Sequence, residues 1–536
     1  MANDTTPQVE APVRSIDKQR VEGEHEEQSP LTKQKTNVAR TIMLSLPSAS
    51  RSLTLLNVAI NTIVLLLAAD FVIYPVLDSA KDVVFTRIGA VYPDSVKLVV
   101  RYPVVNATES QLRILWRQAL STSDSAWHAG PAVHLTAEHD WVSTVTLDGL
   151  WPSTSYEYIL GDDDYSPLTY PTTPIQFLTF PDPRLPSGSH FRFVVSSCVT
   201  PNFPYAPFQG RRIKGFDLLA DYLWPLHSPT AVPVASTPSD AGDDPSPQKT
   251  ETEVTQGLAI EESKANPEFM LFLGDFIYAD VPMYFGDDAE AYRRLYRRNY
   301  QSDSFRRIYE RLPIFHTYDD HEIINNYVGE GNDSTPPFAN AADAFRLYNA
   351  DANFDPLEPE AHYYDFRYAD VAFFVMDTRR YRSDINKVDV TSRSMLGDTQ
   401  LSALYEWLGK HDAKKDSWAA YPYEKMALLN AMHSVPNVIV LSGDRHEFAA
   451  IKFNAEGVGH TVLEVSTSPL SMFYIPFVRT LRMASELMVK TVKEIAEEGG
   501  KVSKVEKELP QEEVLRYIAE GNYKWQVSIR VLSRMH

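Results

Sequence analysis

The sequence predicts an α/β domain preceded by a small β-sandwich and one long apolar helix. Three observations support this fold class. Acidic residues follow apolar, strand-like runs in segments 269–275, 314–322 and 438–446. Short runs with strand patterning occupy residues 83–182, and residues 53–77 are almost continuously apolar. Because ligands bind at the carboxyl ends of strands in an α/β sheet, the three acidic segments predict one shared site.

Length and composition restrict the class of protein further. The 536 residues suffice for two or three domains and a large core. A formal net charge of −20 argues against nucleic acid as a partner, because phosphate backbones demand a basic surface. The single cysteine, Cys198, excludes an intramolecular disulfide. It is either a small hydrophobic residue at a strand end or a metal ligand.

The N-terminal region predicts a tail followed by a membrane anchor. Residues 1–50 are polar and without periodicity, which is typical of disorder. Residues 53–77 are long enough to span a bilayer as a helix, although Asn57, Asn61 and Asp70 interrupt them. The alternative is an amphipathic or buried helix packed on the domain.

Charges beside this apolar segment predict its orientation. All charged residues between Glu27 and the segment are basic, namely Lys33, Lys35, Arg40 and Arg51. The positive-inside rule then leaves the N-terminus cytosolic and the rest of the chain lumenal or extracellular. A lead of fifty residues is too long for a cleaved signal peptide. In that compartment the sequon at Asn106 would be open to glycosylation.

Residues 83–182 predict a β-sandwich domain. Segment 96–102 is rich in β-branched residues, and segment 141–147 alternates apolar and polar side chains. Segment 149–158 resembles the linker before the sixth strand of a fibronectin type III sandwich.

Residues 190–536 predict the larger α/β domain. Segment 191–198 opens it as a strand, and the Pro/Ser/Thr/Asp-rich residues 226–266 predict a disordered insertion. Helical periodicity occurs at 289–311 and 399–408.

Two further elements are expected near the C-terminus. Segment 476–507 predicts a partly basic helix, either membrane-facing or on the solvated surface of the domain. Segment 523–531 predicts a final strand.

The acidic segments carry the residue types of a two-metal site. Asp275 ends the most apolar strand and is the natural bridging ligand, since an Asp that bridges two cations lets them share one hydroxide. Tyr278 follows three residues later, where its phenolate would favour a trivalent ion such as Fe3+. The alternative for Tyr278 is core packing. Asp, His and Tyr together indicate a bimetal hydrolase.

Six motifs follow one another along the chain: Ser196-Ser197-Cys198, Gly274-Asp275-x-x-Tyr278, Asp319-Asp320-His321-Glu322-x-x-Asn325-Asn326, Asp377-Thr378-Arg379-x-x-Arg382, Met395-Leu396-Gly397-x-x-Gln400 and Gly443-Asp444-x-His446. This ordered series resembles that of the PhoD-like alkaline phosphatases, which belong to the calcineurin-like metallophosphoesterase superfamily. The resemblance covers residues 190–470. It implies a two-sheet metallophosphoesterase sandwich flanked by helices, with a metal cluster at its upper edge.

The resemblance also implies the metals and their ligands. Fe3+ with Ca2+ beside it is expected, with Cys198, Asp275 and Tyr278 holding the iron. Asp444 and His446 would close the cluster. Either Asp320 or Asn325 would take the position that an Asn ligand occupies in the wider superfamily, and the sequence leaves both open.

The expected catalytic residues follow from the same motifs. His321 would act on the leaving group as an acid or as a stabiliser of the transition state. Arg379 and Arg382 would hold phosphate oxygens. The alternative for both arginines is a salt bridge beneath the site.

Together these features predict a membrane-anchored, metal-dependent phosphatase that hydrolyses phosphomonoesters or phosphodiesters through a metal-activated hydroxide. The competing hypothesis is a catalytically degenerate fold that serves as a membrane-tethered binding module. The chain differs from secreted bacterial relatives because it lacks a twin-arginine signal and carries an apolar span.

Overall fold

The computed structural model describes residues 38–46, 48, 50–119, 126–185, 191–225, 266–284, 286–334, 336–409, 421–444, 446–457, 459–467, 469–472, 487–496 and 502–518. The chain divides into two compact units, Met1–Leu66 and Leu67–His536. Most of the predicted tail, the predicted insertion at 226–266 except for its last residue, and the predicted strand at 523–531 lie outside the described residues.

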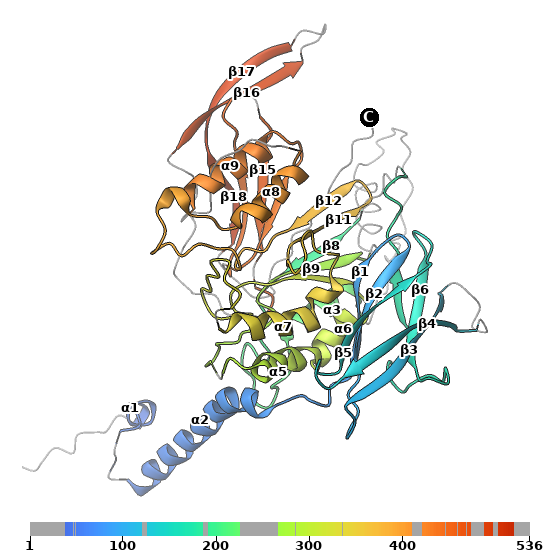
Figure 1. The fold of residues 1–536 in the computed structure, drawn as a ribbon. Helices are drawn as coiled ribbons and strands as arrows, with labels where there is room; N and C mark the ends of the chain where they lie inside the picture. The colour runs from blue at the N-terminus through green and yellow to red at the C-terminus, as the bar shows by residue number, and fades with distance from the viewer. Residues whose placement is uncertain are drawn as a thin grey trace, which may run out of the picture. The chain divides into compact units, whose positions relative to one another are not determined.

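Two helices open the described chain (Figure 1), α1 (Val38–Met43) and α2 (Arg51–Leu77). Helix α1 therefore occupies part of the segment predicted to be disordered. Helix α2 confirms the predicted apolar helix. Its 27 residues, with a mean hydropathy of 2.1 over an 18-residue window, are sufficient to cross a membrane by length and composition. A signal sequence near an N-terminus satisfies the same test.

The C-terminal end of α2 is fixed by polar contacts within the larger unit. The Tyr205 hydroxyl donates to the Leu67 carbonyl at 3.1 Å and to Asp70 Oδ2 at 2.8 Å. Just past the C-terminal end of α2, Asp78 accepts a hydrogen bond from Arg211 at 2.6 Å and pairs with Arg298 at 3.4 Å. Asp70, which interrupts the apolar sequence, therefore has a hydrogen-bond partner outside the helix.

Residues 83–182 form two antiparallel sheets that share one hydrophobic core. The first has the order β1-β2-β5 and the second the order β4-β3-β6-β7. Their strands are β1 (Phe85–Val91), β2 (Ser95–Arg101), β3 (Glu109–Gln118), β4 (His128–Thr136), β5 (Val142–Asp148), β6 (Ser155–Gly161) and β7 (Ile175–Leu178). Strands β2 and β5 confirm the two predicted runs, whereas the likeness to fibronectin type III stays a prediction.

A parallel sheet of order β10-β9-β8 follows, with strands β8 (Phe193–Ser196), β9 (Phe269–Leu273) and β10 (Ile314–Thr317). Its apolar side chains pack against the aromatic faces of the neighbouring helices. These helices are α3 (Lys214–Leu223), α5 (Ala289–Tyr300), α6 (Asp303–Tyr309) and α7 (Phe338–Tyr348), with the short turns η1 (Ala350–Ala352) and η2 (Val390–Ser392) further along the chain. The predicted helical segment 289–311 is thus two helices, and α5 lies beside α7 (Figure 1).

A second, mixed sheet has the order β13-β15-β14-β18. Its strands are β13 (Ile439–Ser442), β14 (Phe448–Phe453), β15 (Val462–Ser466) and β18 (Glu512–Ile518). Helices α8 (Gly397–Trp407) and α9 (Pro422–His433) share its core, and β11 (Tyr364–Tyr368) pairs with β12 (Val371–Val375). A mixed α/β fold with several sheets is confirmed, and the facing of two sheets in one sandwich stays a prediction.

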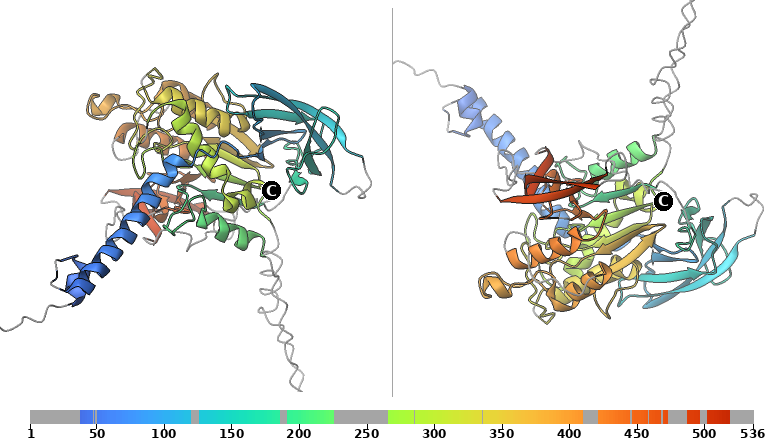
Figure 2. Two further views of the ribbon diagram at one scale, coloured as in Figure 1. Left: turned by 90° about the horizontal axis from the view of Figure 1, so that it is seen from below. Right: turned by 90° about the horizontal axis from the view of Figure 1, so that it is seen from above.

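The prediction of a helix at 476–507 is wrong for the residues of this segment that the structure describes. Residues there form an antiparallel pair, β16 (Met488–Ala496) and β17 (Val502–Pro510), drawn in red in Figures 1 and 2. The abundance of Lys and Glu favours helix, but these charges also suit a hairpin: Lys490 stands opposite Glu508 in the register. Cross-strand pairing therefore outweighs the helix propensity of the segment.

Candidate metal centre

Asp275 lies immediately after β9 at a point of close approach between two loops. Gly274 has a φ of +89°, and a Cβ atom there would lie 2.6 Å from both the Cβ and the backbone nitrogen of Asp319. Glycine at this position therefore allows the loop after β9 to contact the loop after β10. Asp275 itself adopts a left-handed φ of 55° and is almost fully buried.

Four carboxylates meet at this point, from the ends of three strands. Ligand atoms of Asp275, Asp319, Asp320 and Asp444 all lie within 4.8 Å of one another. The first three are buried, whereas the Asp444 side chain is 56% exposed. The structure thus gathers the strand-end acids of β9, β10 and β13 into one acid cluster, open to solvent on the side of Asp444.

Two further groups of possible ligands overlap this acid cluster. One consists of Cys198, Asp275 and His446, and the other of Asp275, Asp320 and His321. Cys198 Sγ lies 3.5 Å from Asp275 Oδ2, although Cys198 also packs in a small hydrophobic cluster with Tyr278. Asp275 is the residue common to all three groups, which is the position expected of a bridging ligand.

Tyr278 connects Asp275 to two histidines. Its hydroxyl donates to Asp275 Oδ2 at 2.9 Å and lies 3.2 Å from His446 Nε2. Its ring centroid is 4.3 Å from that of His321. Burial, together with the neighbouring Cys198 and Asp275, raises the pKa of Tyr278 well above its ordinary value, so the phenol keeps its proton without a metal ion.

His321 is oriented by Asp280, a residue that sequence reasoning missed. The Nδ1 atom of His321 lies 2.6 Å from Asp280 Oδ1. Burial acts to lower the pKa of His321, but the hydrogen bond and charge of Asp280 outweigh it and raise the pKa above its ordinary value. The sequence did place Asp280 close to the candidate ligands, because it follows Tyr278 by two residues.

The two candidate arginines differ in their surroundings. Arg379 is buried, donates to Asp319 through Nε and places Nη2 3.2 Å from Asp320 Oδ1. These are ion pairs of the kind that the salt-bridge alternative expected. Arg382 donates instead to the Tyr421 hydroxyl at 3.1 Å, and its guanidinium lies 5.6 Å from the centre of that ring.

The structure also separates Asp320 from Asn325. Asp320 is buried and belongs to two of the possible ligand groups. Asn325 is exposed, and its backbone N–H donates to Asp280 Oδ2 at 2.9 Å. Of the two residues left open by the sequence, Asp320 is the one that lies in the acid cluster.

Glu322 holds the two acidic loops together, and its role was also missed. Its Oε2 atom accepts the backbone N–H groups of Asp275 at 2.9 Å and of Asp319 at 2.8 Å. Its Oε1 atom accepts the N–H of Phe276 at 2.5 Å. Glu322 and Asp319 both lie within the acidic run that carries Asp320. The sequence therefore located these acids, but it did not show that Glu322 accepts backbone N–H groups while Asp319 and Asp320 belong to the possible ligands.

The electrostatics of the acid cluster fit bound cations. Burial and mutual repulsion raise the pKa of Asp275 well above its usual range, that of Asp319 to about 6 and that of Glu322 to about 8. Asp275 Oδ1 is buried without a hydrogen-bond partner among the described residues. Multivalent cations would relieve both the repulsion and the unpaired oxygen, so this set of donors is suited to metal ions.

The fold and the acid cluster define the class first: a mixed α/β protein with a carboxylate-rich site at its strand ends. A family model described as PhoD-like phosphatase matches residues 257–414 and 409–502. This match confirms the resemblance to PhoD-like phosphatases that the motifs predict.

Two relatives support this assignment. Alkaline phosphatase D from Bacillus subtilis (strain 168) is 27% identical over 248 residues, which cover 34% of this chain and 42% of the relative. The match thus spans less than half the length of that relative. A solved structure described as "Structure of PhoD" has a TM-score of 0.50 at 17% identity and covers 72% of this chain and 76% of its own. At this low sequence identity, the second comparison shows a similar fold alone.

Proposed function

We propose that the protein is a metal-dependent hydrolase of phosphoesters, acting on phosphomonoesters or phosphodiesters. The observation that carries this proposal is the shared position of Asp275 in three groups of possible ligands, within a PhoD-like chain. The competing hypothesis, a degenerate fold that only binds, predicts the loss of ligand residues. Instead Cys198, Asp275 and His446 lie together as a set.

The donors divide into two chemical environments. Cys198, Tyr278 and His446 supply sulfur, phenol and imidazole beside Asp275, a set suited to Fe3+. The all-carboxylate side suits Ca2+, which takes oxygen ligands. Bound there, the cations would neutralise phosphate charge and lower the pKa of water.

His321 is proposed to donate a proton to the departing alcohol. Asp280 accepts from Nδ1, which leaves the Nε2 atom of the ring to face the substrate as the acid. The raised pKa of His321 favours the protonated ring at neutral pH, the form that a general acid needs. Asp280 then acts as a positioning residue, because it fixes the ring and its charge.

Arg379 is proposed to act from beneath the acid cluster. Its ion pairs with Asp319 and Asp320 orient both carboxylates. With cations held by those carboxylates, the guanidinium would be free to hold a phosphate oxygen. Arg382, beside Tyr421, is proposed for the outer rim of the substrate site.

We also propose that α2 anchors the protein in a membrane. Its length and apolar composition support this, and the basic residues Arg40, before the helix, and Arg51, at its first position, support a cytosolic N-terminus. The site would then face a lumenal or extracellular space.

The function is tested with the full chain in detergent, assayed against nitrophenyl phosphate and bis(nitrophenyl) phosphate. Asp275→Asn should lower turnover by about a hundredfold or more and reduce bound metal, because the change removes the charge but keeps the volume of the ligand. Chelator should have the same effect on the wild type. Asp148→Asn, at an exposed strand end, is the matched control. Hydrolysis that survives both Asp275→Asn and chelation would exclude the proposed centre.

A further inference from the structure

The loop 202–212, between β8 and α3, carries the most exposed large apolar side chain among the residues that the structure describes. This side chain is Phe208, which is 87% exposed. Its φ of 61° is left-handed, a conformation that bulky residues rarely adopt. A strained backbone that presents an aromatic ring to solvent gains nothing from contacts within the domain. Such an outlier therefore indicates a contact outside the chain.

Hydrogen bonds close this loop on itself. The Asn202 N–H donates to the Arg212 carbonyl at 2.7 Å, and Asn202 Oδ1 accepts the N–H of Ala206 at 2.9 Å. The Gln209 N–H donates to the Ala206 carbonyl at 3.3 Å. Phe208 therefore stands at the tip of a braced loop.

The loop is fixed against the C-terminal turns of α2, within the compact unit Leu67–His536. The Phe208 N–H donates to Asp70 Oδ2 at 3.4 Å. The rings of Tyr205 and Phe71 meet edge to face, with 5.5 Å between their centroids. Phe208 is thus held at the level of Asp70 on the helix.

Two contacts further along α2 hold the other end of the loop. A Cβ atom on Gly210 would lie 2.1 Å from the Tyr74 ring, so glycine allows the loop to approach the helix closely. Arg211 then donates to both carboxylate oxygens of Asp78, at 2.8 and 2.6 Å. The loop 202–212 therefore follows the helix from Asp70 to its end.

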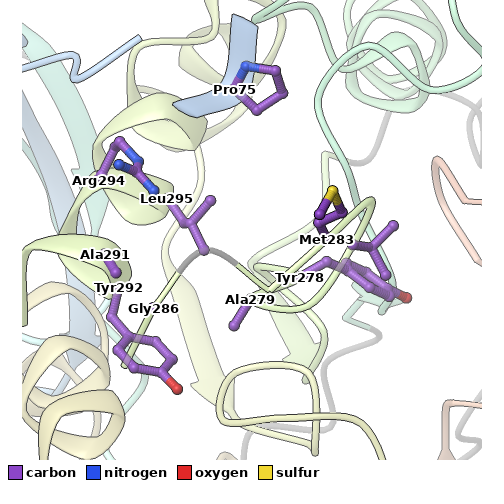
Figure 3. A pocket seen from close by; sticks show the side chains of 10 residues that line it. Pro75, Tyr278, Ala279, Met283, Gly286, Ala291, Tyr292, Arg294 and Leu295 are labelled. Carbon is purple, nitrogen blue, oxygen red and sulfur yellow. The ribbon is translucent and has the colours of Figure 1, made fainter. Parts of the chain in front are cut away.

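The loop after β9 packs against the same end of α2 (Figure 3). Pro75 of α2, Met283 of this loop and Leu295 of α5 line a space with room for about one water molecule. The Arg294 guanidinium donates to the Val76 carbonyl at 3.4 Å. The end of α2 and the loop 202–212 are therefore parts of one packed structure.

The position of Asp70 gives the depth of Phe208 relative to the proposed anchor. The exposed apolar stretch of α2 ends at Leu66, and Asp70 lies four residues later, about 6 Å along the helix axis. The headgroup layer on each side of a bilayer is about 5–8 Å thick. Phe208 is therefore placed within this layer if α2 spans the membrane.

The composition of the loop suits the same layer. Residues 205–214 include three basic side chains and no acidic one, although the whole chain has a net charge of −20. An exposed aromatic ring beside basic residues is typical of segments that lie in the membrane interface. Charge and apolar surface thus both match a bilayer surface.

We propose that the loop 202–212 is a second membrane contact, with the Phe208 ring inserted among the lipid headgroups beside α2. This proposal rests on the proposed anchoring by α2 and adds a contact made by the α/β domain itself. Removal of the ring from water offsets the backbone strain, because burial of apolar surface is favourable. Two attachments would also restrict rotation of the domain about the helix.

The test uses the full chain in lipid nanodiscs, with an environment-sensitive fluorophore on an introduced cysteine. Cys198 is buried and should take up no thiol reagent, which the wild type checks. In Gln209→Cys the probe lies beside Phe208. Its emission should shift to the blue, and lipids that carry a spin label near the headgroup should quench it. Val105→Cys is the matched control, because Val105 in the β-sandwich is 85% exposed and its probe should report water.

A second substitution assigns this signal to the ring. Phe208→Asp in the Gln209→Cys background should abolish the blue shift and the quenching, whereas Phe208→Leu should retain both. The exposure of Phe208 allows both variants to fold, and thermal unfolding checks this. Val58→Cys, in the exposed apolar part of α2, tests the anchor separately and should be quenched by spin labels near the chain ends.

The outcomes separate the loop from the anchor. Quenching in Val58→Cys but not in Gln209→Cys, or quenching in Gln209→Cys that survives Phe208→Asp, would overturn the membrane contact and leave the anchor in place. A blue shift in Gln209→Cys without quenching by lipid would indicate a second copy of the chain on Phe208, which also contradicts the proposal. No quenching in Val58→Cys would refute the anchor itself.

Discussion

At the scale of single residues, Glu322 shows how one buried carboxylate organises others. It contributes no atom to the possible ligand groups, yet it accepts the backbone N–H groups of both Asp275 and Asp319. These hydrogen bonds set the distance between the loops after β9 and β10. The acid cluster therefore depends on a residue that need not touch a metal ion.

Glu322→Gln should weaken metal binding and turnover by about ten- to a hundredfold, because the amide cannot accept all three backbone N–H groups. Metal content and kcat provide the measurement. Glu424→Gln is a matched control, since buried Glu424 accepts the N–H groups of Met395 and Leu396 at 2.8 and 3.2 Å, away from the acid cluster. Both variants should lose stability, but only the first should lose metal. Equal metal content in the two would contradict this role.

A second prediction at this scale concerns iron. If Tyr278 and Cys198 coordinate Fe3+, the protein should absorb visible light through charge transfer from these ligands to the metal. Cys198→Ser should shift this band and lower activity, whereas a cysteine that only packs should be replaceable with little effect. The spectrum of the purified protein, with its metal analysis, provides the measurement. A colourless and fully active protein that contains only zinc or calcium would refute the iron assignment.

At the scale of elements, Asp140 ties the β-sandwich to the helices of the α/β domain. Its carboxylate pairs with Arg101 at 3.0 Å and with Arg297 of α5 at 2.6 Å, and it accepts from the Tyr348 hydroxyl of α7. Burial alone would raise the pKa of Asp140, but the two arginines outweigh it and hold the pKa below its ordinary value.

Because the folded pKa of Asp140 is lowered, its stabilisation is present above the unfolded pKa of about 4 and is lost as the pH falls through the folded value. Asp140→Asn should lower the free energy of unfolding by about 3–5 kcal/mol at neutral pH, since two buried arginines lose their shared partner. It should also flatten the loss of stability below about pH 4. Denaturant unfolding across this range provides the measurement. Asp182→Asn, which breaks an exposed pair with Arg184, should leave the curve unchanged.

The elements also show what the sequence can predict. The acids after β9, β10 and β13 were recognisable because an apolar run followed by acids is a local pattern. The pairing of Asp280 with His321 joins residues 41 positions apart, so it emerges only when the loops fold together. The hairpin β16–β17 was mistaken for a helix because the spacing of its charges is compatible with a helix as well as with a strand. The two structures are distinguished only by the pairing of each strand with its partner.

At the scale of the whole molecule, the proposed topology leads to a test with sealed microsomes. The sequons at Asn106 and Asn332 are exposed, so both should carry glycan if the α/β domain lies in the lumen of a eukaryotic host. Protease added outside should then digest only the N-terminal lead. Asn106→Gln with Asn332→Gln should remove the shift in mobility that glycosidase removes. A domain digested from the cytosolic side and free of glycan would invert the topology.

The contact between Tyr205 and α2 has a consequence for the choice of membrane. Because Leu67 and Asp70 are engaged by Tyr205, the free apolar part of the helix runs from Leu53 to Leu66. A helix of that extent is about 21 Å long at 1.5 Å per residue, against a hydrocarbon thickness of roughly 30 Å. On the proposed anchoring, this hydrophobic mismatch favours thin bilayers such as that of the endoplasmic reticulum over sterol-rich plasma membranes. Tyr205→Phe would free a further turn of the helix and should move the protein towards thicker membranes.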